Sequence, residues 1–228
     1  MVGDKFERTR PTLALCRPVN NGSSSYNGCP LLQPSPQPML ASLLPHLQRF
    51  GPVPLPDCAR LLAAWQPRTV RADEFLASAG QIAQELFFVQ RGVLRIVSQL
   101  PNGKEVTHGF FQESQFCALL HSFVHQVPAV ASIQAGCAAQ VLAIRKAGLD
   151  ELCQQLPYLP GLLGQMTQQG LWEKVQLRNS YLGRDARACY QQFLRQQPDV
   201  ARRVPLATIA SYLGITPQSL SRLRKTTG

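Results

Sequence analysis

The sequence predicts an α+β protein: an N-terminal antiparallel β-roll, a long helix and a C-terminal helix-turn-helix domain. Three observations lead to this prediction. Short segments rich in Val, Ile and Phe and separated by glycines occupy the first half of the chain. An apolar stripe with helical spacing follows them, and two short amphipathic helices around a glycine end the chain. Short strands at regular spacing are typical of rolls and sandwiches, and the change of period marks the transition to helix.

The β-roll is predicted from the short apolar segments and the turns between them. Asn102-Gly103 stands between two of these segments, and Asn-Gly is a strong hairpin signal because both residues tolerate the positive φ of a tight turn. We therefore expect neighbouring strands to pair antiparallel. The candidate strands are residues 68–71, 85–90, 93–97, 105–111, 131–134 and 140–144.

Composition divides the chain into four expected segments. Residues 1–38 are rich in Pro, Ser, Asn and Gly, bury too little apolar surface to offset the entropy of ordering, and are predicted to be a disordered leader. Met39 opens a better-patterned stretch and is our hypothesis for the native start. The β-roll, interpreted as a sensor domain, is expected over residues 39–158, a dimerisation helix over 159–183 and the helix-turn-helix domain over 184–228.

The apolar stripe of the long helix begins with Leu159, Leu163 and Met166 and continues in residues that drift around the helix: Leu171, Val175 and Leu182. Two interpretations are open. The stripe can pair with its copy in a homodimer, or it can pack on its own domain. Two-fold operators demand two-fold proteins, which favours the homodimer.

Charge is concentrated at the C-terminus. The chain carries a net charge of +10, the last 48 residues hold eight basic and two acidic residues, and no acidic residue follows Asp199. A basic block of this kind is typical of a surface that faces phosphates, so double-stranded DNA is the predicted partner. The seven cysteines are scattered without a CxxC pair, which indicates reduced thiols, and no stretch of 18 apolar residues occurs. We therefore predict a cytoplasmic protein without a membrane span.

The helix-turn-helix is predicted over residues 206–225. The first helix has an apolar face that ends at Leu213, and Gly214 supplies the left-handed residue of the turn. Thr216 is the expected N-cap of the second helix, and Pro217 takes the first helical position, where its missing N–H costs nothing. Leu220 and Leu223 are expected to bury the second helix.

The remaining side chains of the second helix are predicted to contact DNA in two ways. Gln218 and Arg222 lie four residues apart on the exposed face and are the candidate base-reading residues, because Gln pairs with adenine and Arg with guanine through two hydrogen bonds. The candidate contacts to the DNA backbone are Thr216, Ser219, Ser221, Arg224 and Lys225.

With these features the chain resembles the Crp/Fnr family of bacterial transcription regulators. The resemblance covers roughly residues 40–228, and residues 190–194, 203–206 and 209–217 are similar to the signature of a short subgroup. It implies a β-roll of the cyclic-nucleotide-binding type (a jelly roll), a dimerising helix and a winged helix, with RNA polymerase as a candidate partner. Only three residues follow Lys225, so most of the wing is expected to be missing.

The sensor departs from this family. Members that bind cyclic nucleotides carry a Gly-Glu pair and an Arg that neutralises the phosphate. Here the corresponding stretch is residues 113–120, and the Arg position holds Ala129. Because a buried phosphate needs a cation, we expect a degenerate effector domain without cyclic nucleotide. Cys16, Cys29 and Cys58 are too far apart for the iron–sulfur cluster of the oxygen-sensing branch. No cofactor is predicted, and the effector stays unidentified.

Two alternatives belong to other functional classes. A sensor of this fold can act through a protein partner, in which case the basic C-terminus would be idle. A cupin-like metalloenzyme is also a small β-roll, and His121 and His125 lie at i, i+4; however, His108 stands alone and no His-x-His pair is present. We therefore expect no metal site, no catalytic residues and no enzymatic activity.

Overall fold

The computed structural model describes residues 42–227. The predicted leader and the hypothetical start at Met39 lie outside these residues. The described chain opens with two short helices, α2 (Leu43–Gln48) and α3 (Leu55–Ala63). Pro54 precedes α3 and Asp57 lies in its first turn, where a negative charge favours the helix N-terminus.

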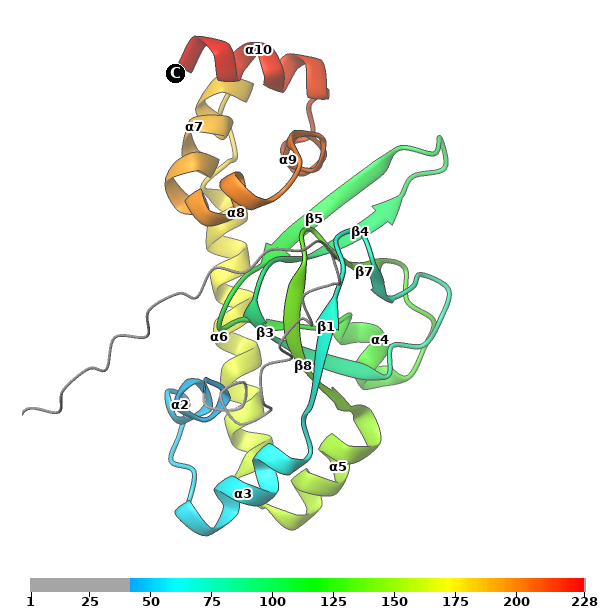
Figure 1. The fold of residues 1–228 in the computed structure, drawn as a ribbon, viewed down its shortest axis with the longest axis vertical. Coiled ribbons are helices and arrows are strands. Elements are labelled where there is room, and N and C mark those ends of the chain that lie inside the picture. The colour runs from blue at the N-terminus through cyan, green and yellow to red at the C-terminus, as the bar shows by residue number, and fades with distance from the viewer. Residues whose placement is uncertain (1–41, 228) are drawn as a thin grey trace, which may run out of the picture. The chain divides into compact units, whose positions relative to one another are not determined.

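Eight short strands form two four-stranded antiparallel sheets that make the roll (Figure 1). One sheet has the order β1-β8-β3-β6, and the other has the order β2-β7-β4-β5. A short helix, α4 (Leu120–His125), separates β6 from β7. The strands are β1 (Gln66–Val70), β2 (Phe75–Ala77), β3 (Glu85–Arg91), β4 (Leu94–Gln99), β5 (Glu105–Phe111), β6 (Phe116–Cys117), β7 (Ser132–Ala135) and β8 (Ala139–Arg145).

The α+β fold class and the antiparallel roll are confirmed. Each of the six candidate strands overlaps a strand of the structure, and β4 and β5 pair across the turn that contains Gly103, whose φ is +78°. The sequence missed β2, β6 and α4. These elements have three, two and six residues, which is too short for either period to be recognised.

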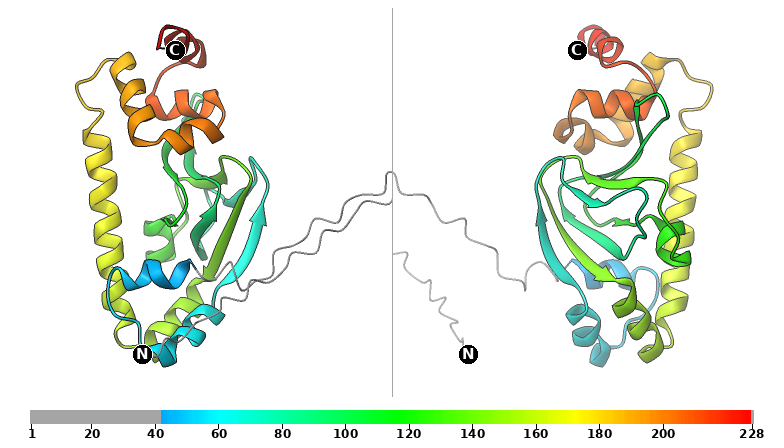
Figure 2. Two further views of the ribbon diagram at one scale, coloured as in Figure 1. Left: turned by 60° about the vertical axis from the view of Figure 1, so that its left-hand side comes forward. Right: turned by 90° about the vertical axis from the view of Figure 1, so that its right-hand side faces the viewer.

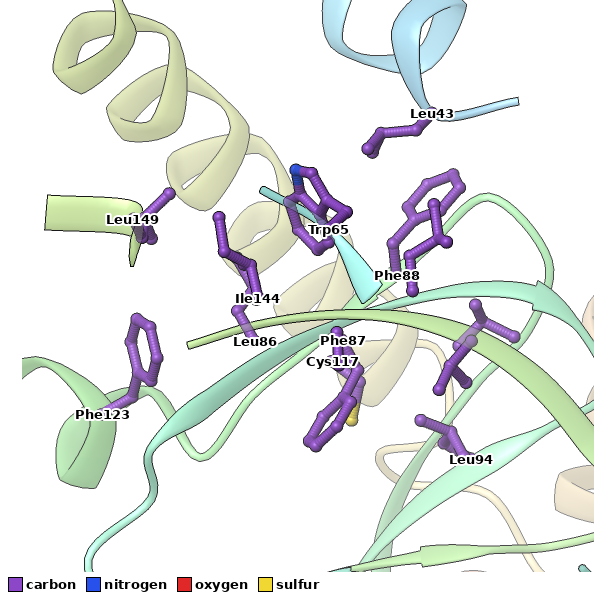
Figure 3. Close-up of a cluster of buried hydrophobic side chains, with 14 of the residues drawn as sticks. Leu43, Trp65, Leu86, Phe87, Phe88, Leu94, Cys117, Phe123, Ile144 and Leu149 are labelled. Atoms are coloured by element: carbon purple, nitrogen blue, oxygen red, sulfur yellow. The ribbon is translucent and has the colours of Figure 1, made fainter. Parts of the chain in front are cut away.

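The core of the roll is formed by side chains of both sheets and by the helices at one end. Phe87 and Phe88 are fully buried on β3, and Leu43 of α2 and Trp65 pack into the same cluster (Figure 3). The ring of His46 on α2 lies 5.4 Å from the ring of Phe88, measured between centroids. The helices that precede the strands therefore close the roll.

Two helices follow the roll, α5 (Lys146–Gln155) and α6 (Leu159–Asn179). The apolar stripe of α6 has two parts, and they correspond to the two interpretations of the sequence, packing on its own domain and pairing with a second copy. Leu159 is buried and Leu163 packs against the core of the roll, whereas Leu171 and Val175 are 55% and 50% exposed. The first half of the stripe thus packs on its own domain, and the second half is left uncovered in the single chain.

Four helices complete the chain: α7 (Ala186–Gln196), α8 (Pro198–Arg203), α9 (Leu206–Leu213) and α10 (Pro217–Thr227). Asp185 caps α7 by accepting a hydrogen bond from the Ala188 N–H. Phe193 and Leu220 are fully buried in a second apolar cluster. Among the described residues, no helix has the length and apolar character needed to cross a membrane.

Candidate nucleic-acid interface

The turn between α9 and α10 has the geometry that the sequence predicts. Gly214 ends α9 with φ +70° and ψ 20°, in the left-handed region. The Ile215 N–H donates to the Ala210 carbonyl at 3.0 Å, which satisfies a free carbonyl at the end of α9. A Cβ at position 214 would have no neighbour within 4 Å. Glycine is favoured here by the backbone conformation alone, not by lack of space.

The start of α10 is fixed by Thr216. Its Oγ1 accepts the Ser219 N–H at 3.1 Å and lies 2.9 Å from the Ser219 Oγ, so Thr216 is the N-cap, as predicted. Pro217 occupies the first helical position. The two hydroxyls sit together at the exposed N-terminus of the helix, where free N–H groups and the helix dipole favour an anion such as a phosphate.

α10 presents two different faces. Leu220 is fully buried, and Leu223 is half-buried and packs on the same cluster together with Ile209 and Ala210 of α9. The predicted base-reading residues, Gln218 and Arg222, are both exposed. Of the predicted contacts to the DNA backbone, Ser221 is half-buried and the others are exposed: Thr216, Ser219, Arg224 and Lys225.

The long polar side chains of α10 are free for a partner. Within the part of the chain that the structure describes, the side chains of Gln218, Arg222, Arg224 and Lys225 form no hydrogen bond or ion pair with each other or with a neighbouring helix. The helix has two basic residues in its last turn and no acidic residue in its first. An exposed helix of this kind matches the shape and hydrogen-bonding needs of a DNA major groove.

The segment of the roll that corresponds to a phosphate-binding cassette has no cation of its own. Ala118 and Leu119 precede α4, and α4 begins without a side-chain cap. Ala129 is buried; its N–H donates to the Gln81 carbonyl at 2.9 Å, and its own carbonyl accepts the Gly80 N–H at 2.8 Å. A methyl group locked between two backbone hydrogen bonds therefore stands where the resemblance expects an arginine.

Two cations that the sequence analysis did not single out lie on the roll. Lys174 of α6 donates from its Nζ to the Phe110 carbonyl at 2.7 Å and lies 3.9 Å from the centroid of the Phe111 ring. Burial lowers the pKa of Lys174. Arg95 of β4 is 4% exposed and donates to Thr107 and Gln134. No local pattern could have found either cation, because each is defined by a partner on another element.

A groove lies between α4 and α6 and has a volume of about 660 Å³. Leu120 and Val124 form one wall, and Leu163 and Leu171 form the other. The rings of His121 and His125 line the groove too, with centroids 4.9 Å apart. Within residues 42–227, no third His, Cys, Asp or Glu joins this pair in a cluster that could hold a metal. Its chemistry is that of an apolar contact surface.

The comparisons with known proteins identify the roll. Residues 67–156 match the cyclic nucleotide-binding domain family. The roll is a cyclic nucleotide-binding domain in fold. This match covers the two sheets and α5.

Solved structures share the fold over most of the described chain. The regulator CLP of Xanthomonas campestris, described as responsive to c-di-GMP, is 16% identical, with a TM-score of 0.60 over 76% of this chain and 91% of its own. A CooA mutant from Carboxydothermus hydrogenoformans is 18% identical, with a TM-score of 0.55 over 73% of this chain and 78% of its own. A protein of Ruegeria pomeroyi described as a candidate cyclic nucleotide binder is 19% identical, with a TM-score of 0.56 over 84% and 87%. No curated protein matches the sequence significantly.

Proposed function

We propose that this protein is a homodimeric regulator of transcription that binds specific DNA sequences and whose sensor roll does not take cyclic nucleotide. The observation that carries the proposal is α10, which is anchored by buried Leu220 and exposes Gln218 and Arg222 on its outer side. The basic C-terminal block and the fold shared with the regulator CLP support it. Such a regulator acts on DNA in the cytoplasm of a bacterium.

The proposed contacts are of two kinds, contacts to base edges and contacts to the DNA backbone. The Gln218 amide matches the N6 and N7 of adenine, and the Arg222 guanidinium matches the O6 and N7 of guanine. Thr216, Ser219 and Ser221 offer hydroxyls to the phosphates, and Arg224 and Lys225 offer charge.

Base reading by Arg222 is tested by comparing its alanine variant with the alanine variant of Lys225, a nearby positive charge on the same helix. An operator is first selected from random double-stranded DNA, and binding is then measured for all of its single-base variants. Arg222→Ala should relax the preference at one position of each half-site by about 1–3 kcal/mol. Lys225→Ala, the matched control, should weaken all sequences alike and reduce the slope of log K against log salt by about 1 per chain. An Arg222→Ala protein with an unchanged preference profile would refute the base-reading role. A wild-type protein that selects no sequence would refute the function and favour a sensor that acts through a protein partner.

The proposed dimer uses the uncovered half of α6. Leu171 and Val175 are joined by Trp172, which is 60% exposed, and the groove beside α4 continues this apolar surface. Monomeric proteins rarely leave a contiguous apolar surface of this kind in water, and a two-fold pair would place the two α10 helices on half-sites about one helical turn (~34 Å) apart. Light scattering should find a dimer at micromolar concentration and a monomer for Leu171→Glu. Gln176→Glu, a polar exchange on the same helix, should stay dimeric. A monomeric wild-type protein that ignores palindromic DNA would contradict this part of the proposal.

The absence of cyclic nucleotide binding is tested by thermal unfolding. A ligand present at a hundredfold its dissociation constant stabilises the folded state by about 2.7 kcal/mol. Because Ala129 offers no cation to a cyclic phosphate, millimolar cyclic AMP should change neither the melting temperature nor the DNA affinity. A clear upward shift of the melting temperature with millimolar cyclic AMP would overturn this expectation.

A further inference from the structure

β5 is the outer strand of its sheet, so the outward backbone groups of this strand have no strand partner. Ser211 of α9 takes the place of that partner. Its Oγ accepts the Thr107 N–H at 2.9 Å and donates to the Glu105 carbonyl at 2.9 Å. The backbone polar groups of residues 105 and 107 point toward the same edge of an extended strand. A backbone group at a sheet edge that is covered from water needs a hydrogen-bond partner of this kind. One hydroxyl of α9 therefore satisfies two outward backbone groups at the edge of the sensor sheet. The ribbon of α9 packs against β5 (Figure 2).

A second connection joins the turn after β5 to the end of α8. Arg203 donates to both carboxylate oxygens of Glu113, at 2.9 Å from its Nη2, although the two residues are ninety positions apart. Each partner is also held on its own side. The Gly92 N–H donates to Glu113 at 2.7 Å, and the Arg203 Nε donates to the Asp199 carbonyl at 3.0 Å. A bidentate ion pair held in this way fixes the orientation of α8 relative to the roll as well as the distance between them.

Apolar contacts lie between these two polar connections. The ring of Phe110 on β5 lies 5.1 Å from the ring of Tyr212 on α9, and 6.0 Å from that of Phe193 on α7, between centroids. A Cβ on Gly136 of the roll would approach the Val204 Cγ1 to 3.1 Å, so the side chain of Val204 packs closely against the backbone of Gly136. Several contacts spread over α7, α8 and α9 prevent rotation about any one of them.

The docking leaves the proposed DNA surface free. It uses Ser211, Arg203 and the apolar cluster, and none of the exposed polar residues of α10 takes part within the described chain. A contact that blocked DNA would cover Gln218 or Arg222, and both are exposed. The contact therefore orients α10 without covering its exposed polar face.

We propose that Glu113, Arg203 and Ser211 are positioning residues for DNA binding: they lock the helix-turn-helix onto β5 and onto the turn after it, and thereby set the direction of α10. The turn at Glu113 leads directly into β6 (Phe116–Cys117) and the residues that replace the phosphate cassette. The inference rests on the proposed function for its DNA readout, whereas the docking itself is measured without DNA.

The docking is tested by hydrogen exchange of residues 105–111 and 206–213 in the full-length chain. Ser211→Ala should speed exchange of the segment that contains the Thr107 N–H by about tenfold or more, and Arg203→Gln and Glu113→Gln should do the same to both segments. Glu113→Gln keeps an oxygen for the Gly92 N–H, so the roll should stay intact. Arg202→Gln is the matched control, because Arg202 stands beside Arg203 and pairs locally with exposed Asp199. Unchanged exchange in all three variants would overturn the lock.

Operator affinity then tests the positioning role. Arg203→Gln and Arg202→Gln remove the same charge, so they share any general loss of attraction to DNA. Arg203→Gln should bind about tenfold more weakly than Arg202→Gln, and Glu113→Gln combined with Arg203→Gln should be no weaker than Arg203→Gln alone, because both remove one interaction. Equal binding of the two arginine variants, or tighter binding after undocking, would refute positioning. If even the wild-type chain binds no DNA, the proposed function fails, while the exchange data still decide the docking.

Discussion

The two apolar clusters of this protein are built in different ways. The cluster of the roll is closed by its own strands and by α2, α3, α5 and α6, with Phe87 and Phe88 completely excluded from solvent. The cluster under α9 and α10 is smaller and includes two residues of the roll, Val93 and Phe110. Small helical units bury too little surface for independent stability. The helix-turn-helix thus shares part of its core with the sensor, whereas the cluster of the roll includes no described residue of α7, α8, α9 or α10.

The largest expected effect is on the free energy of unfolding, when one aromatic ring is removed from each of the two clusters in separate variants. Phe88→Ala should lower the free energy of unfolding by about 3–5 kcal/mol, because it empties a fully buried site on β3, and exchange should rise throughout the roll. Phe110→Ala should cost about 3 kcal/mol at most, because its cluster is smaller and can collapse around the gap. Segment-resolved hydrogen exchange should then rise in α7 and α9 while β3 and β8 stay protected. Equal loss of protection in both regions would mean that the two clusters unfold as one unit.

An intermediate effect on the free energy of unfolding is expected from replacing two glycines, one in each region, that both have a positive φ. Gly103 and Gly214 have φ of +78° and +70°, and neither would crowd an added Cβ. Alanine at either position should therefore cost about 1–2 kcal/mol through conformation alone. Gly103→Ala should destabilise the roll with little change in operator affinity, and Gly214→Ala should weaken DNA binding as well. Gly214→Asn, which tolerates the left-handed region, serves as the control and should recover part of the loss. Identical DNA affinity of the two alanine variants would contradict the assigned roles.

The smallest expected effect is a pH dependence confined to the roll. Burial against Phe50, Phe88 and Phe116, and then the charge of Arg49, lower the pKa of His46, while Glu173 opposes them weakly. The unfolded chain therefore binds a proton before the folded chain does, so stability is full above the unfolded pKa of about 6.5 and falls as the pH drops below it. Melting temperatures between pH 7.5 and 5.5 should decline less for His46→Phe than for the natural chain. Parallel curves would show that His46 plays no part.

The sequence predicted well those features that are encoded within a few neighbouring residues. The turn at Gly214, the cap at Thr216 and the buried and exposed sides of α10 follow from spacing over about twenty residues, so the local geometry of this helix was predicted from the sequence, and its contacts with DNA stay predictions. The longer strands were predicted because each contains enough residues to reveal a period. β2, β6 and α4 were missed because two to six residues do not suffice, and the positions of β2 and β6 depend on strands that pair with them from elsewhere in the chain.

By itself, the sequence determined the kinds and the order of the longer elements and the polar character of the exposed face of α10, because propensity, capping and turn formation are local. The tertiary structure decided the rest. It divided the stripe of α6 into a packed half and an uncovered half, brought Lys174 onto β5, buried Arg95 and joined Glu113 to Arg203. These outcomes depend on which surfaces meet after the chain has folded back on itself, and a contact between residues ninety positions apart leaves no periodic signal in either segment. The sequence therefore specified α10 as an amphipathic helix, and only the packing specified how that helix is held.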